Sequence, residues 1–75
     1  MQKYNNSGKT KGINAYESGF DFIRVRFDDG AQYLYTYSST GSKHIEKMKI
    51  LASRGDGLDR YINQHVADRY ESKEK

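Results

Sequence analysis

The chain of 75 residues is long enough for one small domain with a single hydrophobic core. Hydrophobic residues make up 35% and charged residues 31%, the formal net charge is +3, and no apolar run approaches the roughly 20 residues that would span a membrane. The absence of cysteine excludes disulfides, thiolate metal sites and a cysteine nucleophile, and residues 1–15 contain no apolar secretory segment, so we expect a cytoplasmic protein without membrane contact.

The excess positive charge lies at the start of the chain. Residues 1–11 hold three lysines and no acidic residue, whereas residues 12–70 hold eight basic and eight acidic side chains. The first segment is polar and has no hydrophobic period, which predicts a flexible basic arm. We expect residues 12–70 to fold as one domain and residues 71–75 to form a frayed charged tail.

Alternation of apolar and polar residues predicts three antiparallel strands. They cover residues 13–16, 20–27 and 31–37. The second strand places one set of side chains toward each face of the sheet, because successive residues alternate. One face carries Ile23, Val25 and Phe27; the other carries Arg24 and Arg26.

The segment Asp28-Asp29-Gly30 predicts a three-residue hairpin turn between the second and third strands, with Gly30 in the left-handed conformation. This turn pairs Val25 with Tyr33, so that apolar partners share one face. A two-residue loop would set Val25 opposite Leu34 and Arg26 opposite Tyr33, so that an arginine and a tyrosine would share a face. We therefore prefer the three-residue turn.

From residue 42 onward the hydrophobic period changes from two to about 3.6 residues, which predicts a helix. This first helix places Ile45, Met48 and Ala52 on one side. Ser42 fits the N-cap position, and Gly55 is suited to end the helix.

A second helix is predicted to begin near Asp56 or Gly57, with Asp56 as its cap. Its apolar stripe recurs at every fourth residue: Leu58, Ile62, Val66 and Tyr70. The order of elements is therefore β-β-β-α-α, and each layer has one apolar side. We predict an α+β fold in which a three-stranded antiparallel β-meander is followed by two helices packed on one face.

Several short motifs stand in a distinctive order along the chain. They are Val25-Arg26-Phe27, Gly30, the central Tyr33-Leu34-Tyr35, Ala52-Ser53-Arg54-Gly55, Leu58-Asp59, Ile62 and Tyr70. In this order the segment from Gly12 to Tyr70 resembles the KTSC domain, found at the C-terminus of some lysyl-tRNA synthetases and as free-standing small bacterial proteins. The family usually has a proline-containing linker after Tyr-x-Tyr, and this chain has no proline.

The resemblance to the KTSC family implies no catalytic residues, and RNA is the ligand suggested for the family. It singles out four residues, for which we expect a structural role: Tyr33, Tyr35, Ser53 and Gly55. The predicted hairpin register also places Tyr33, Tyr35 and Tyr37 on the core face, with their hydroxyls at its edge.

Two groups of side chains are candidate nucleic-acid contacts. The first, on the open face of the sheet, consists of Arg24 and Arg26 with Phe22 as a stacking ring; the second, along a narrow arc of the first helix, consists of Lys43, Lys47 and Arg54. Basic and aromatic side chains of this kind bind phosphates and unpaired bases. For the second group, a solvated helix face is the simpler explanation and the one we favour.

The residues present no constellation for catalysis, cofactor or metal binding. The chain lacks a Gly-x-Ser-x-Gly nucleophile motif and a cofactor fingerprint. His44 and His65 are each isolated in the sequence, without a histidine or carboxylate at the spacing of a convincing zinc site, and the segment 56–59 lacks the remaining ligands of a calcium loop. We therefore expect a protein that is not an enzyme and uses no cofactor or metal.

Two hypotheses for function remain open. The first is a small RNA-binding module, with DNA the less favoured ligand, that uses a local basic patch formed by the two groups above. The second is a protein-interaction module without nucleic acid, such as an adaptor or inhibitor of phage or mobile-element type. It would bind a protein partner or a second copy of the chain through an exposed strand edge near Ile13.

Overall fold

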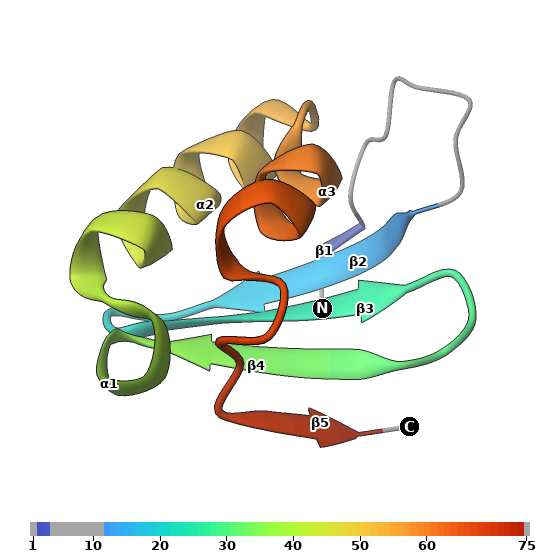
Figure 1. The fold of residues 1–75 in the computed structure, drawn as a ribbon. Coiled ribbons are helices and arrows are strands. Elements are labelled where there is room, and N and C mark those ends of the chain that lie inside the picture. Colours follow the sequence, from blue (N-terminus) through green and yellow to red (C-terminus); the bar gives the residue numbers. More distant parts are fainter. Residues whose placement is uncertain (1, 4–11, 75) are drawn as a thin grey trace.

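The structure is a computed structural model that describes residues 2–3 and 12–74. Within them, five strands form one antiparallel sheet in the order β1-β2-β3-β4-β5. The strands are β1 (Gln2–Lys3), β2 (Ile13–Ser18), β3 (Phe22–Phe27), β4 (Gln32–Thr36) and β5 (Ser72–Glu74). The helices are α1 (Tyr37–Thr40), α2 (Ser42–Arg54), α3 (Leu58–Tyr61) and the π-helical turn η1 (Ile62–Val66). Figure 1 shows α2 and α3 above one face of the sheet.

The predicted α+β fold is confirmed, with β2, β3 and β4 as the meander and the helices on one face. Two further strands extend the sheet at its edges. β1 lies within the predicted flexible arm and pairs with Ala15 and Tyr16 of β2. It therefore covers part of the strand edge near Ile13 that was predicted to be exposed. Residues 4–11 of the arm lie outside the described residues. β5 pairs with β4, so the prediction of a frayed tail is wrong for residues 72–74.

The turn between β3 and β4 has the predicted three-residue form. The Phe27 N–H donates to the Ala31 carbonyl at 2.8 Å, which closes the hairpin. Gly30 has a φ of 93°, a conformation that side-chain-bearing residues rarely adopt. The register pairs Val25 with Tyr33, as predicted.

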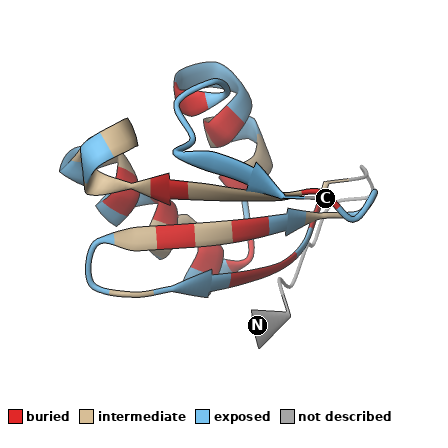
Figure 2. Ribbon diagram, turned by 90° about the horizontal axis from the view of Figure 1, so that it is seen from below, coloured by how far each residue is buried: buried red, intermediate tan, exposed pale blue. Residues whose placement is uncertain are grey.

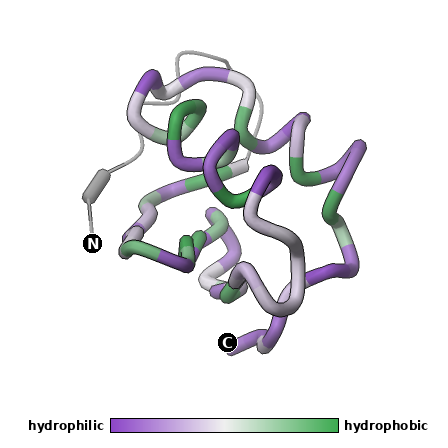
Figure 3. The backbone as a smooth tube through the Cα atoms, turned by 90° about the vertical axis from the view of Figure 1, so that its left-hand side faces the viewer, coloured by the Kyte–Doolittle hydropathy of each residue, from purple (hydrophilic) through white to green (hydrophobic). Residues whose placement is uncertain are grey.

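The hydrophobic core lies between the sheet and the helices. Ile23 and Tyr35 are partners across β3 and β4, and both are almost completely buried. Ile45 and Met48 of α2 and Leu58 of α3 are equally buried above them. Figure 2 shows buried residues alternating with less buried ones along the central strands, and Figure 3 shows hydrophobic positions recurring along both layers. This alternation closes one face of the sheet and leaves the other open.

The predicted core tyrosines are buried to different degrees. Tyr35 is 1% exposed, whereas Tyr33 and Tyr37 are half-buried and pack against the core. Tyr37 is not in a strand, because Thr36 ends β4 and caps α1. The Ser39 N–H donates to Thr36 Oγ1 at 3.0 Å, and the Thr36 N–H donates to Ser39 Oγ at 3.1 Å, which is a reciprocal capping box.

The helix α2 begins and ends at glycines. Gly41 is its N-cap and no side chain caps the helix, so the prediction of Ser42 as N-cap is wrong; Ser42 is the first helical residue. Gly55 ends α2 as predicted, in the left-handed conformation with φ 71°. Its N–H donates to the carbonyls of Leu51 and Ala52 at 3.0 and 3.1 Å.

The second predicted helix is present but interrupted. One α-helical turn, α3, passes into the π-helical turn η1, and the chain leaves the helix before Tyr70. Gly57 is the N-cap, without a side-chain hydrogen bond, so the prediction that Asp56 caps this helix is wrong.

Hydrogen bonds to other elements draw the chain out of this helix. Thr40 Oγ1 donates to the Arg69 carbonyl at 2.7 Å, and the Glu71 N–H donates to the Leu34 carbonyl at 2.6 Å. These bonds attach residues 69–71 to α1 and β4. The chain then continues as β5 beside β4 (Figure 1).

Replacing Gly30 with alanine is expected to lower the free energy of unfolding by about 1 kcal/mol. No atom lies within 4 Å of the position that a Cβ would take, so the cost comes from the backbone conformation alone. Gly30→Asn should cost less, because asparagine tolerates positive φ better than alanine. Urea denaturation of the three proteins measures this. Equal stability of Gly30→Ala and the native chain would contradict the turn.

Candidate functional site

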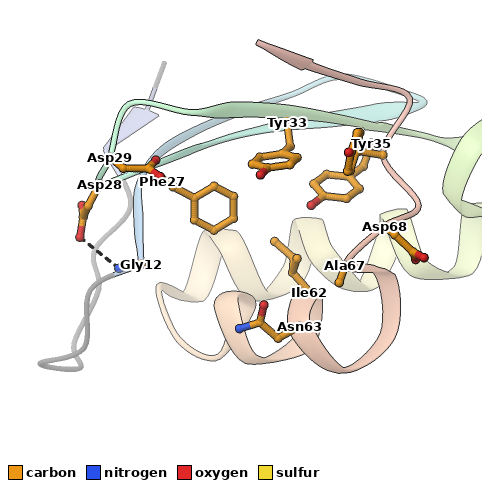
Figure 4. Close-up of a pocket in the computed structure, with 11 residues that line it drawn as sticks. Gly12, Phe27, Asp28, Asp29, Tyr33, Tyr35, Ile62, Asn63, Ala67 and Asp68 are labelled. Carbon is orange, nitrogen blue, oxygen red and sulfur yellow. Dashed lines mark hydrogen bonds between the residues drawn. The ribbon is translucent and has the colours of Figure 1, made fainter. Parts of the chain in front are cut away.

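A pocket of about 630 Å³ opens between one end of the sheet and the helical layer (Figure 4). It lies between η1 and the end of the sheet where β3 and β4 meet in their hairpin. Its lining residues are Gly12, Phe27, Asp28, Asp29, Tyr33, Tyr35, Ile62, Asn63, Ala67, Asp68 and Tyr70. The sheet contributes mainly aromatic rings, and the segment from η1 to residue 70 contributes the facing side.

The aromatic rings of the pocket form one connected cluster around Tyr33. The Phe27 ring meets the Tyr33 ring edge-on at a centroid distance of 5.3 Å, and the Tyr70 ring does so at 4.9 Å. Tyr35 is stacked with Tyr33 at 6.3 Å. Figure 4 shows the hydroxyls of Tyr33 and Tyr35 directed from the sheet into the cavity. The pocket therefore combines ring surfaces with two phenolic oxygens.

Tyr35 keeps its hydroxyl protonated. Burial is the main cause that raises the pKa of Tyr35 above its ordinary value of 10.0, and the neighbouring Tyr33 and Tyr70 raise it further. A neutral phenol both donates and accepts hydrogen bonds. The Tyr35 hydroxyl bonds to no other residue in the described part of the chain, so it is available to a ligand.

Three aspartates lie around the pocket, and no basic residue is among the described residues that line it. Asp28 Oδ2 accepts a hydrogen bond from the Gly12 N–H at 3.0 Å, and Asp29 Oδ1 accepts one from the Ala31 N–H at 2.9 Å. Asp68 is exposed and has no hydrogen-bond partner within residues 2–3 and 12–74. The pocket thus places negative charge beside electron-rich rings.

The aromatic cluster already contacts one cation of the chain itself. Lys73 lies opposite Tyr33 in the register of β4 and β5, and its Nζ is 5.4 Å from the centroid of the Tyr33 ring. This geometry is a cation–π contact. Lys73 does not line the pocket, so the contact lies beside the cavity.

The two predicted groups of nucleic-acid contacts lie on opposite sides of the molecule. Arg24 and Arg26 alternate along β3 with the buried Ile23 and Val25, so they belong to the open face of the sheet. The second group consists of Lys43, Lys47 and Arg54, all exposed on α2, which covers the other face. The structure therefore does not bring the two groups together into one basic patch.

The predicted stacking surface on the open face of the sheet is already engaged within the chain. Arg24 forms an ion pair with Glu17 at 3.4 Å, and its guanidinium carbon is 5.9 Å from the centroid of the Phe22 ring. The Phe22 ring packs against the backbone of Gly19. Arg26 is exposed and has no ion pair within the described residues.

The four residues singled out by the family resemblance fall in two places. Tyr33 and Tyr35 belong to the wall of the pocket. Ser53 and Gly55 belong to the end of α2, where Ser53 Oγ donates to the Ile50 carbonyl at 2.9 Å and Gly55 is the C-cap.

The two histidines, which are far apart in the sequence, meet in the structure. His44 Nδ1 lies 2.7 Å from the Tyr61 hydroxyl, and the Tyr61 and His65 ring centroids are 4.6 Å apart. The two imidazole centroids are 6.0 Å apart. Within the described residues no group of three or more side chains is placed to hold a metal ion.

Sequence reasoning missed the pocket as a site, although it named part of its wall. From the sequence, Asp28 and Asp29 were interpretable only as turn residues. They directly follow the aromatic Phe27, however, and acidic residues next to an aromatic residue are a local signal for such a site. Asp68 and Tyr70 gave no comparable signal, because they continued a helical pattern.

Comparison of the chain with models of protein families, with curated proteins and with solved structures finds no match. The resemblance to the KTSC family therefore depends on the sequence motifs alone. Within residues 2–3 and 12–74 there is no helix with the length and apolar character to cross a bilayer.

Raising the pH above about 10 is expected to destabilise the protein through Tyr35. The folded-state pKa is raised, so this contribution to stability is fully present below the unfolded pKa and is lost as the pH rises through the folded pKa. Tyr35→Phe cannot ionise at this position, and its free energy of unfolding should fall less steeply with pH. Urea denaturation between about pH 8 and 11 gives the two slopes. Parallel slopes would show that Tyr35 is not responsible.

Proposed function

We propose that this protein is a non-enzymatic module of the KTSC type that binds a protein partner through the pocket. One observation carries the proposal: the pocket combines aromatic rings with three aspartates, and none of the described residues that line it is basic. Carboxylates at this position repel the phosphates of a nucleic acid and attract basic side chains. The proposal corresponds to the second hypothesis from the sequence, with the pocket in place of a strand edge.

The size and composition of the pocket support recognition of a side chain. Its volume of about 630 Å³ lies in the range of about 300–1,000 Å³ that is usual for ligand sites. Such sites combine an apolar or aromatic wall with a few polar groups that orient the ligand. Here Phe27 and Ile62 are apolar, and Asn63 and Asp68 are polar groups on the helical side.

RNA binding through α2 is the second candidate function. Its three basic residues, Lys43, Lys47 and Arg54, are exposed and form no ion pair within the described residues. Each can contact a phosphate. Because Arg24 and Arg26 face the other side, α2 alone brings several of the predicted contact residues together within the described part of the chain. We therefore expect weak binding that does not depend on sequence and falls with salt.

Fluorescence anisotropy with four labelled probes tests the two functions. The probes are short basic, acidic and uncharged peptides of equal length, and a single-stranded RNA, each measured over a salt series. We expect the basic peptides to bind and the acidic and uncharged ones not to bind. RNA binding should be weak and should disappear by about 0.2 M salt.

Two charge-matched variants locate the binding of the basic peptides. Asp68→Asn removes the pocket carboxylate that has no hydrogen-bond partner among the described residues, whereas Asp21→Asn removes one at the opposite end of β3. Asp68→Asn should weaken peptide binding about threefold to fivefold, and Asp21→Asn should leave it unchanged. Salt-resistant RNA binding that Lys47→Ala abolishes, together with no binding of basic peptides, would contradict the proposed function.

A further inference from the structure

We infer that the pocket takes the guanidinium group of an arginine side chain from the protein partner. This inference rests on the proposed function and deepens it, because it selects one basic group among those that the charge of the pocket permits. Three features of the pocket favour a guanidinium group: its charge, the arrangement of its hydrogen-bond acceptors, and its ring surfaces.

The charge of the pocket favours a cation and disfavours an anion. The carboxylates of Asp28 and Asp29 accept hydrogen bonds from the backbone N–H groups of Gly12 and Ala31 at one end of the pocket, and Asp68 lines it on the helical side. None of the described lining residues supplies a positive charge to neutralise them. A phosphate or carboxylate ligand would meet like charges here, whereas a cation would compensate them.

The acceptors of the pocket are distributed in a way that suits a flat, multiply donating cation. The hydroxyls of Tyr33 and Tyr35 enter from the sheet, and the amide of Asn63 and the carboxylate of Asp68 lie on the helical side (Figure 4). A guanidinium carries five N–H donors in one plane and can reach acceptors on two sides at once. A lysine ammonium donates from a single point, and a quaternary ammonium donates none.

The ring surfaces supply the third feature. Guanidinium planes stack on aromatic faces, and the cluster around Tyr33 offers rings in both stacked and perpendicular orientations. The contact between Lys73 Nζ and the Tyr33 ring shows that a cation already lies against this cluster at its outer side. The cavity of about 630 Å³ leaves room for the extended side chain of an arginine as well as its head group.

Titration of the full chain with three small ligands, followed by two-dimensional ¹H–¹⁵N NMR, tests the inference. The ligands are N-acetyl-arginine methylamide and its lysine and citrulline counterparts. Citrulline has nearly the shape of arginine but no charge. Comparing the affinities of the two compounds therefore separates the effect of charge from the effect of shape. We expect the arginine compound to bind with a Kd of about 1 mM and to shift the amide signals of the lining residues.

The lysine compound should bind at least about threefold more weakly than the arginine compound, and the citrulline compound should cause no saturable shift. Asp68→Asn and Tyr70→Leu should each weaken arginine binding about threefold to tenfold. Asp21→Asn is the control and should have no effect. The native signal dispersion of each variant shows that it is folded, and Asp68→Asn alters only an exposed side chain without a described partner.

Equal binding of arginine and citrulline, shifts confined to residues outside the pocket, or no shifts at ligand concentrations well above 1 mM would overturn the inference. Lysine binding as tight as arginine would also overturn it. If basic peptides still bind through Asp68 in that case, the proposed function stands and only the choice of arginine fails. If no basic peptide binds, the proposed function fails as well.

Discussion

The register of the β3–β4 hairpin determines which side chains meet in this protein. The three-residue turn that ends at Gly30 sets Val25 opposite Tyr33 and Ile23 opposite Tyr35. A slip of one residue would turn the arginines of β3 toward the helices and the tyrosines toward solvent, because side chains alternate between faces. The core and the aromatic wall of the pocket are therefore two parts of one sheet face, both set by the same turn.

That same turn also gives the pocket its charge. Asp28 and Asp29 accept backbone hydrogen bonds from Gly12 and Ala31, and both residues line the hairpin end of the pocket. The basic side chains are spread over the open sheet face and the outer side of α2. A chain with a formal net charge of +3 thus has an acidic hollow. Net charge describes the whole surface and is a poor guide to one binding site.

Local patterns predicted much of the fold, and they failed where contacts between distant parts of the chain decide the conformation. The apolar residues at four-residue spacing from Leu58 to Tyr70 predicted one helix. The first part of it is present, but the chain passes through η1 and then leaves the helix. The reason is the pair of hydrogen bonds from Thr40 and to Leu34, which fix residues 69–71. Their partners are about 30 to 40 residues earlier in the chain, and no local pattern records them.

The sequence by itself determined the features that depend on neighbouring residues: the strand faces, the turn at Gly30, the end of α2 at Gly55 and the order of elements. Steric limits on φ and the alternation of side chains act over a few residues, so a local reading finds them. Only the tertiary structure decided the pocket. Tyr70 reaches the Tyr33 ring, and β5 replaces the expected tail, because segments some 40 residues apart are brought together by packing and backbone pairing. The tertiary structure also decided that the basic residues lie on two opposite sides of the molecule. The helices cover one face of the sheet, and the arginines of β3 belong to the other face.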